Sequence, residues 1–384
     1  MDNTLAALSS LVIGKLSPLD EWIEEDWIRI VETALSNGMG PMLLWSLARA
    51  GLEKQSWTMP LKRESRWIGL EYIRIELAFQ QVQTAFDTAA IPALWLKGIA
   101  LSATVYPEPT LRPMGDLDVL VPPDHRDRAL KLLKTLGYLP GDWKSLFEVS
   151  DPITSEFAYH HQLHHQNLGV ILELHERFPL TILKPENMAW FWTQKQSLNN
   201  SSAMTLMPEA HLLYLCAHAT LQHGENEFRL LRYLDLHLLI TQTELQWSIV
   251  VEQAITFGWT YSVERALNVT KKYFATQIPN RVFAQLESRR PASEDVLFAE
   301  RLGTKGADWG KVRRQLAMLP LEKRFRYLAR IAFPPFAFMR QHYGNRFGRF
   351  TLLAYFYRWY NQGIKVSSWL ISKRERSNEH SKLP

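Results

Sequence analysis

The chain has almost no cysteine and no long apolar run. Cys216 is the single cysteine among 384 residues, which excludes an intrachain disulfide and a zinc site built from several thiolates. No window holds 18 uninterrupted apolar residues, which argues against a membrane-spanning helix. The first residues lack a basic region followed by an apolar block, so no signal peptide is expected. These absences together favour a cytoplasmic protein.

The composition is that of a globular protein with an uneven charge. Apolar residues make up 46% of the chain and charged residues 22%, and a chain of this length would form about two or three domains. Residues 301–384 contain 18 Lys and Arg against 4 Asp and Glu, a balance of +14, although the whole chain carries only +5. This basic region could meet nucleic acid, an anionic membrane surface or an acidic partner. It could equally be a solvated face that packs against the acidic remainder.

The hydrophobic pattern divides the chain into four regions. They are an N-terminal helical region (1–90), an α/β core (91–184), a helical module (185–320) and a basic, aromatic-rich helical tail with a frayed end (321–384). The predicted fold class is therefore α+β, with a small mixed sheet flanked by helical regions on both sides of it in the sequence.

Short apolar runs and helical patterns alternate within the core. The expected elements are a strand at 91–98, a helix at 99–106, a strand at 117–121, a helix at 124–138, and two strands at 155–166 and 169–178. Asp124 is expected to cap the second of these helices, and Gly137 to end it.

Two aspartates begin an otherwise apolar strand in TLRPMGDLDVLV (110–121). Side chains two residues apart on a strand share a face, so Asp116 and Asp118 point together. Close carboxylates repel each other unless a cation bridges them, and Mg²⁺ prefers such oxygen ligands. A structural alternative is that Asp116 caps a turn after Gly115 while Asp118 meets an arginine.

Two further features make these acids part of a constellation. Glu173 lies in a second apolar strand, ILELHERF, with His175 on the same face. Lys97-Gly98 lies at a turn between a strand and a helix, where backbone N–H groups can meet phosphates. His175 could position an acceptor or the acid, or it could be a buried hydrogen-bonded histidine.

Several segments together resemble an uncharacterised bacterial nucleotidyltransferase family of the DNA polymerase beta-like nucleotidyltransferase superfamily. The segments are LKGIAL, YPEPTLRPMGDLDVLV and ILELHERF. The similarity continues in HLLYLCAHATLQHG, RLLRYLDLHLL and AFPPFAFMRQHYG, so it covers nearly the whole chain. The resemblance implies that the α/β core is a nucleotidyltransferase core.

The resemblance also implies roles for individual residues. Asp116 and Asp118 match the superfamily's metal-binding aspartates, and Glu173 matches the third carboxylate, which helps to activate the acceptor. Gly98 falls at the turn that holds the nucleotide phosphates. The wider superfamily usually has Gly-Ser or Gly-Gly at this turn, whereas this chain has Lys97-Gly98, so Lys97 would supply charge where the serine is missing.

The implied reaction is metal-dependent nucleotidyl transfer. Mg²⁺ or Mn²⁺ held by the three acids would orient the α-phosphate and stabilise the attacking and leaving oxygens. An NTP, with ATP as the first expectation, would give NMP to a hydroxyl or amine of an unknown acceptor: a small molecule, a peptide, a protein or RNA. Arg112, in the loop before the acids, could neutralise the triphosphate by bidentate contact, or it could be an exposed loop arginine.

A second class of function stays open, a non-catalytic nucleotide-binding or scaffold protein on a degenerate nucleotidyltransferase fold. The missing serine favours this class, whereas the three acids in order favour the enzyme. In the tail, aromatic residues such as Phe325 and Tyr327 interleave with Arg324 and Arg326. This pattern would suit RNA or an anionic membrane surface, and it also suits a helical core rimmed by arginines.

Several histidines and one aspartate outside the two strands that carry the acids are further candidate site residues. His218, His223 and Asp235 lie on helices that resemble the family's helical module, where they could line the cleft or form a buried network. Four more histidines lie in YHHQLHHQ (159–166). As a strand this segment separates same-face histidines by about 13 Å, too far to share an ion, so we expect a polar strand beside the site and not a metal centre.

Overall fold

The computed structural model describes residues 2–15, 22–140, 160–178, 185–199, 201–222, 228–290, 321–334 and 352–360, with isolated positions 316, 336, 339, 340, 343 and 347. The chain forms two compact units. The first consists of Met1–Gly141 and His160–Leu302, and the second of Asp142–Tyr159 and Gly303–Pro384.

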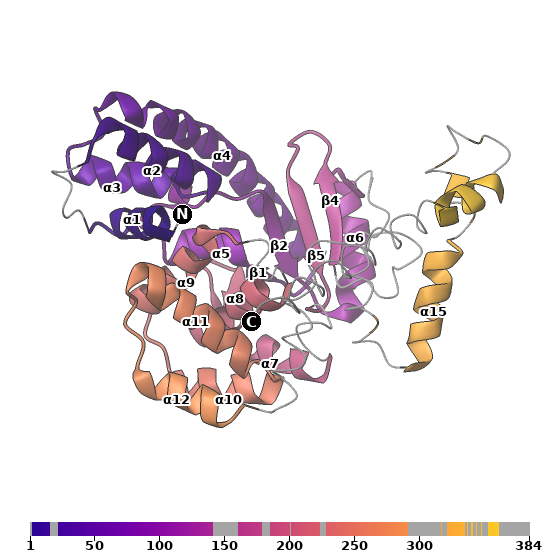
Figure 1. The fold of residues 1–384 in the computed structure, drawn as a ribbon. Coiled ribbons are helices and arrows are strands. Elements are labelled where there is room, and N and C mark those ends of the chain that lie inside the picture. Colours follow the sequence, from indigo (N-terminus) through magenta and orange to yellow (C-terminus); the bar gives the residue numbers. More distant parts are fainter. Residues whose placement is uncertain are drawn as a thin grey trace. The chain divides into compact units, whose positions relative to one another are not determined.

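Four helices precede the first strand in the part of the chain that the structure describes. They are α1 (Asp2–Val12), α2 (Glu24–Ser36), α3 (Gly40–Arg49) and the 30-residue α4 (Met59–Thr88), with a short 3₁₀ turn at Ser56–Thr58. Proline in the first turn begins both α3 and α4, a position where its missing N–H would be unpaired in any case. Figure 1 shows α2 and α3 beside α4, and α1 packs against α2 and α3.

A seven-stranded sheet forms the centre of the first unit, in the order β3-β4-β5-β2-β1-β7-β6. The strands are β1 (Leu94–Leu96), β2 (Asp116–Leu120), β3 (Tyr138–Pro140), β4 (His160–His165), β5 (Ile171–His175), β6 (Lys195–Ser197) and β7 (Met204–Leu206). β2 pairs with β5 and β1 with β7 in parallel, and the other neighbours are antiparallel. The predicted α+β class with a mixed sheet is therefore confirmed.

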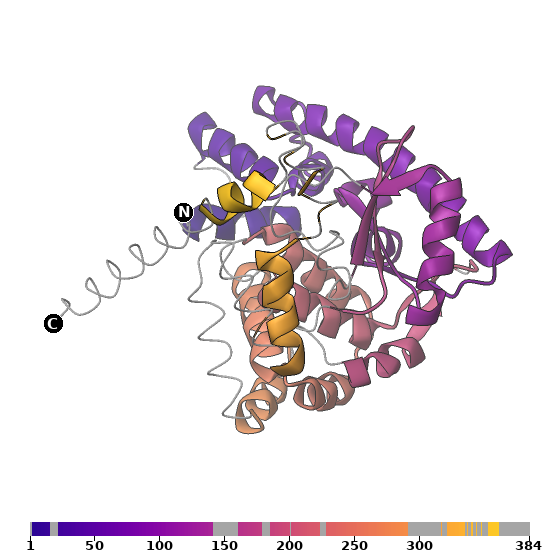
Figure 2. The same ribbon diagram turned by 90° about the vertical axis from the view of Figure 1, so that its right-hand side faces the viewer.

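Helices cover both faces of the sheet. On one face, α4 and α6 (Arg126–Thr135) contribute to a core cluster with Leu117, Val119 and Leu172. The other face packs through Leu96 and Leu120 into a larger cluster. That cluster includes α5 (Lys97–Thr104) and the helices after β7, which Figures 1 and 2 colour pink to orange.

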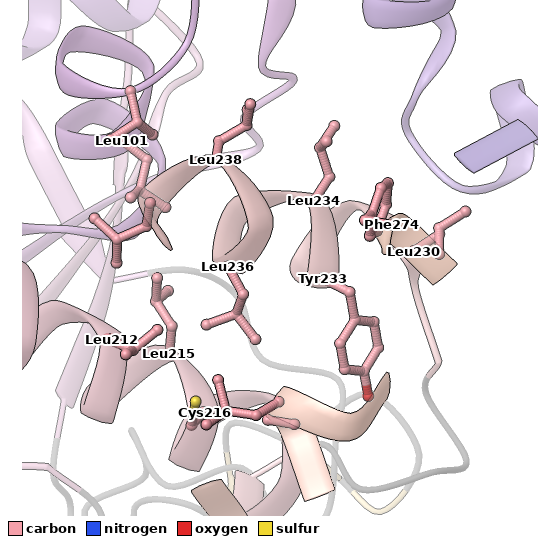
Figure 3. Packing of buried hydrophobic residues seen from close by; sticks show 14 of the residues in the cluster. Leu101, Leu212, Leu215, Cys216, Leu230, Tyr233, Leu234, Leu236, Leu238 and Phe274 are labelled. Atoms are coloured by element: carbon pink, nitrogen blue, oxygen red, sulfur yellow. The ribbon is translucent and has the colours of Figure 1, made fainter. Parts of the chain in front are cut away.

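Six described elements follow β7 in the first unit. They are α8 (Pro208–Ala217), a π-helical turn (His218–Gln222), α9 (Leu230–Gln242), α10 (Trp247–Phe257), α11 (Thr260–Phe274) and α12 (Asn280–Ser288). Figure 3 shows Leu212 and Cys216 of α8 near Leu236 of α9. Burial raises the pKa of the Cys216 thiol well above its usual range, so Cys216 behaves as a small core residue. α7 (Met188–Thr193) lies before β6, and α15 (Leu321–Ala332) belongs to the second unit.

Two local predictions need correction. The 91–98 strand covers only Leu94–Leu96, because Lys97 already begins α5. Asp124 does not cap α6; Pro122-Pro123 first set up a 3₁₀ turn (Pro123–His125), and His125 precedes the helix without a side-chain cap. Gly137 does follow the end of α6, with a left-handed φ of +89°. Residues 155–159 of the predicted β4 segment lie outside the described residues.

None of the described helices is both long enough and apolar enough to cross a membrane.

Candidate active site

β2 presents its two aspartates on one face of the sheet. Leu117 and Val119 point to the opposite face, where they are fully buried. β2 lies between β1 and β5, and Asp118 is in register with Leu96 on one side and Glu173 on the other. The alternation of the strand and the parallel pairing therefore bring Asp118 and Glu173 side by side.

His175 joins these two acids two residues further along β5. Its Nε2 lies 3.0 Å from Asp118 Oδ1 and 3.5 Å from Glu173 Oε2. The ring is 2% exposed. Of the two alternatives for His175, the structure shows a buried histidine that contacts the acids directly.

Lys97 approaches Asp118 from the β1–α5 junction. Its Nζ donates to Asp118 Oδ1 over 2.6 Å. The Lys97 backbone has φ +46°, a left-handed conformation that costs roughly 1–2 kcal/mol for a residue with a Cβ. The surrounding contacts therefore hold a strained residue in the conformation that aims its ammonium at the acids.

The charges of the cluster shift the pKa values of its members in different directions. Burial, and then the neighbouring Asp118 charge, raise the pKa of Asp116 to about 7. Burial also opposes ionisation of Asp118, but the Lys97 ammonium and His175 outweigh it and hold the Asp118 pKa well below its usual range. The same contacts keep the pKa of Lys97 and that of His175 above their ordinary values, against the effect of burial.

The donor set suits a divalent cation. One ligand atom each from Asp118, Glu173 and His175 can lie within 4.8 Å of the others, and this is the one such group in the described part of the chain. Carboxylate oxygens suit Mg²⁺ or Mn²⁺, and an imidazole nitrogen is a further ligand for transition metals. The sequence predicts Asp116, Asp118 and Glu173 as the metal ligands; Asp116 lines the same cleft as the other two acids, and His175 completes the three-atom group with them.

Arg112 is engaged by the helical module. Its Nε and Nη2 donate to the two carboxylate oxygens of Asp235 over 2.9 and 2.8 Å, and Tyr106 Oη donates to Asp235 Oδ1 over 2.7 Å. Both members of the ion pair are buried. Arg112 is therefore not an exposed loop arginine. Its guanidinium makes the expected bidentate contact, but with Asp235 of α9 and not with a phosphate.

Gly98 is required by packing within the chain. A Cβ at this position would lie 2.8 Å from Arg112 Nη1 and 2.8 Å from Met114 Cγ. These two side chains fill the space beside the turn in which the nucleotide phosphates were expected.

A cleft of about 320 Å³ connects these groups. The predicted residues that line it are Lys97, Gly98, Arg112, Asp116, Asp118, Glu173, His218 and Asp235. His223 lies outside the described residues. Sequence reasoning missed Arg229 and Arg232, which also line the cleft; the available signal was two arginines three residues apart at the start of RLLRYLDLHLL.

β4 pairs with β5 beside the site, and His161, His164 and His165 do not line the cleft. The strand predicted there is present, with His164 exposed and His165 buried. His165 meets the edge of Tyr138, and its Nδ1 accepts from the N–H groups of Asn167 and Leu168. In the second unit, Phe325 on α15 is exposed and Tyr327 is buried, so both interpretations of the aromatic tail remain predictions.

A comparison with protein-family models identifies one family. A model of the family described as uncharacterised nucleotidyltransferase matches residues 24–275. The match runs from α2 to the last residues of α11 and includes every residue of the cleft. A search of curated proteins found no match.

Proposed function

The chain belongs to the uncharacterised nucleotidyltransferase family, and from that premise we propose that it transfers NMP from an NTP, with ATP as the first candidate, to a hydroxyl or amine of an acceptor. One observation carries the proposal. The ligand atoms of Asp118, Glu173 and His175 converge within 4.8 Å, beside Asp116 in the same cleft.

The carboxylates would hold the metal that this chemistry uses. Asp118 and Glu173, together with Asp116 from the same strand, would bind Mg²⁺ or Mn²⁺. When bound, the ion supplies Lewis-acid stabilisation of the charge on the reacting phosphate oxygens.

The remaining groups position protons and charge around the acids. His175, whose pKa is raised by its hydrogen bonds to Asp118 and Glu173 against the effect of burial, holds the two acids in place. Glu173, whose pKa is lowered by its hydrogen bond to His175 against the effect of burial, can accept a hydrogen bond from the acceptor hydroxyl or amine and receive its proton. Lys97 offsets the charge of Asp118, which reduces repulsion between the acids and an incoming polyphosphate.

The test is transfer of label from each of the four NTPs labelled at the α-phosphate. The protein is incubated with Mg²⁺ or Mn²⁺ and with pools of small molecules, peptides, proteins and RNA. Label should enter one acceptor pool with wild type and with Asp127→Asn, a control that removes an exposed carboxylate of α6. Label should be absent with Asp116→Asn/Asp118→Asn.

Two results would contradict the proposal. Equal labelling by the double variant would show that the acids do not form the site. Nucleotide binding without transfer to any pool would instead support the non-catalytic nucleotide-binding protein.

A further inference from the structure

Two of the cationic side chains that line the cleft, Lys97 and Arg112, are held by acids of the chain itself. Lys97 donates to Asp118, and Arg112 forms a bidentate pair with Asp235. A triphosphate carries roughly four negative charges at neutral pH, and its recognition usually relies on arginine, lysine or metal contacts. Cations beyond Lys97 and Arg112 are therefore needed for the polyphosphate.

The turn after β1 offers little room for that role. Arg112 Nη1 and Met114 lie within 3 Å of the place where a Gly98 Cβ would be. A phosphate that approached Gly98 from the Cβ side would meet both side chains. The anion is thus directed toward the opposite wall of the cleft.

That wall is formed by the beginning of α9. Arg229 immediately precedes the helix and Arg232 lies in its first turn, three positions later. Both line the cleft that contains Asp116, Asp118 and Glu173. Within the described ranges Arg229 makes no ion pair. The start of α9 is itself fixed, because the Leu230 N–H donates to Asn37 Oδ1 over 3.1 Å.

The cleft therefore has an acidic side and a basic side. We propose that Arg229 and Arg232 bind the β- and γ-phosphates of the nucleotide, while the acids bind the metal next to the α-phosphate. This inference rests on the proposed function and adds the polyphosphate site to it. Arginine suits the role because its planar guanidinium donates two parallel hydrogen bonds to phosphate oxygens.

The test measures binding and does not depend on turnover. Inorganic tripolyphosphate, ATP and AMP, each with Mg²⁺, are titrated into the full chain by calorimetry. Arg229→Gln and Arg232→Gln should each weaken tripolyphosphate and ATP binding about tenfold or more, since a hydrogen bond to a charged group contributes that much. AMP binding should change less than threefold, and Arg229→Lys should retain part of the affinity because it keeps the charge.

Arg281→Gln is the matched control, because Arg281 is an exposed arginine of α12 outside the cleft lining. Its titrations should match those of wild type. If wild type binds tripolyphosphate and both cleft variants bind it within twofold of wild type, the polyphosphate site is wrong while the transferase proposal stands. If the cleft variants lose AMP and ATP equally, the arginines do not act on the β- and γ-phosphates. If wild type binds no tripolyphosphate and transfers no label, both proposals fail.

Discussion

Asp235 is the residue at which the buried network is most easily broken. It accepts two hydrogen bonds from Arg112 and one from Tyr106. The side chains of Arg112 and Asp235 are only 11% and 3% exposed. Asp235→Ala would leave a buried guanidinium without its counter-charge, and removing one partner of such a pair lowers the free energy of unfolding by about 3–5 kcal/mol. Asp235→Asn should lose less, because the amide oxygen still accepts from Arg112 or Tyr106.

The measurement is urea unfolding followed by tryptophan fluorescence and by far-UV circular dichroism, with agreement of the two probes as the check on two-state behaviour. Glu252→Ala serves as the comparison. Glu252 also pairs with an arginine through both oxygens, Arg289, at 2.6 and 3.1 Å, but on the surface. Its removal should produce no measurable change, because water screens an exposed pair. An Asp235→Ala loss no larger than that of Glu252→Ala would refute the reasoning.

Two further predictions concern single positions. Gly98→Ala should lower the free energy of unfolding by about 1–3 kcal/mol, because its Cβ would overlap Arg112 and Met114. Gly69→Ala in α4 is the control: its Cβ meets nothing within 4 Å, so the free energy of unfolding should rise by up to about 1 kcal/mol. Equal effects of the two variants would contradict the packing argument. Burial raises the pKa of Glu64 from 4.5 to about 7, so the folded state keeps a proton that the unfolded chain releases, and wild type loses stability as pH rises from 4.5 to 7. In thermal unfolding across that pH range, Glu64→Gln should therefore be as stable as wild type near pH 4.5 and more stable above pH 7. The expected gain in the free energy of unfolding is about 1–2 kcal/mol, which allows for solvent around this half-buried group. A difference between the two proteins that does not change with pH would show that ionisation is not the cause.

The parts of the site that follow a local repeat could be predicted from the sequence. Strand alternation alone places Asp116 and Asp118 on one face and Leu117 on the other. The same reasoning pairs Glu173 with His175, and both pairs keep these relations in the structure. The short strands β3, β6 and β7 could not be predicted from an alternating pattern. Each has three residues, too few for a period of two to appear, and β6 is the polar segment Lys195–Ser197.

Contacts between distant segments could not be predicted in this way. Arg112 and Asp235 are separated by 123 positions, and each separately fitted a role at the nucleotide. Only their pairing in the folded chain shows that they neutralise each other. Arg229 and Arg232 escaped notice for the opposite reason, because arginines at the start of a helix are usually solvated and nothing local relates them to the acids of β2.

The bidentate Arg112–Asp235 pair also determines how freely the cleft can change its width. Arg112 precedes β2 in the chain and Asp235 lies in α9, so the pair ties the two walls together. Moving the walls apart would expose or separate a buried ion pair, an unfavourable step that thermal motion rarely makes. A ligand would then enter a cavity whose shape already exists, and its binding would lose little free energy to ordering of the protein.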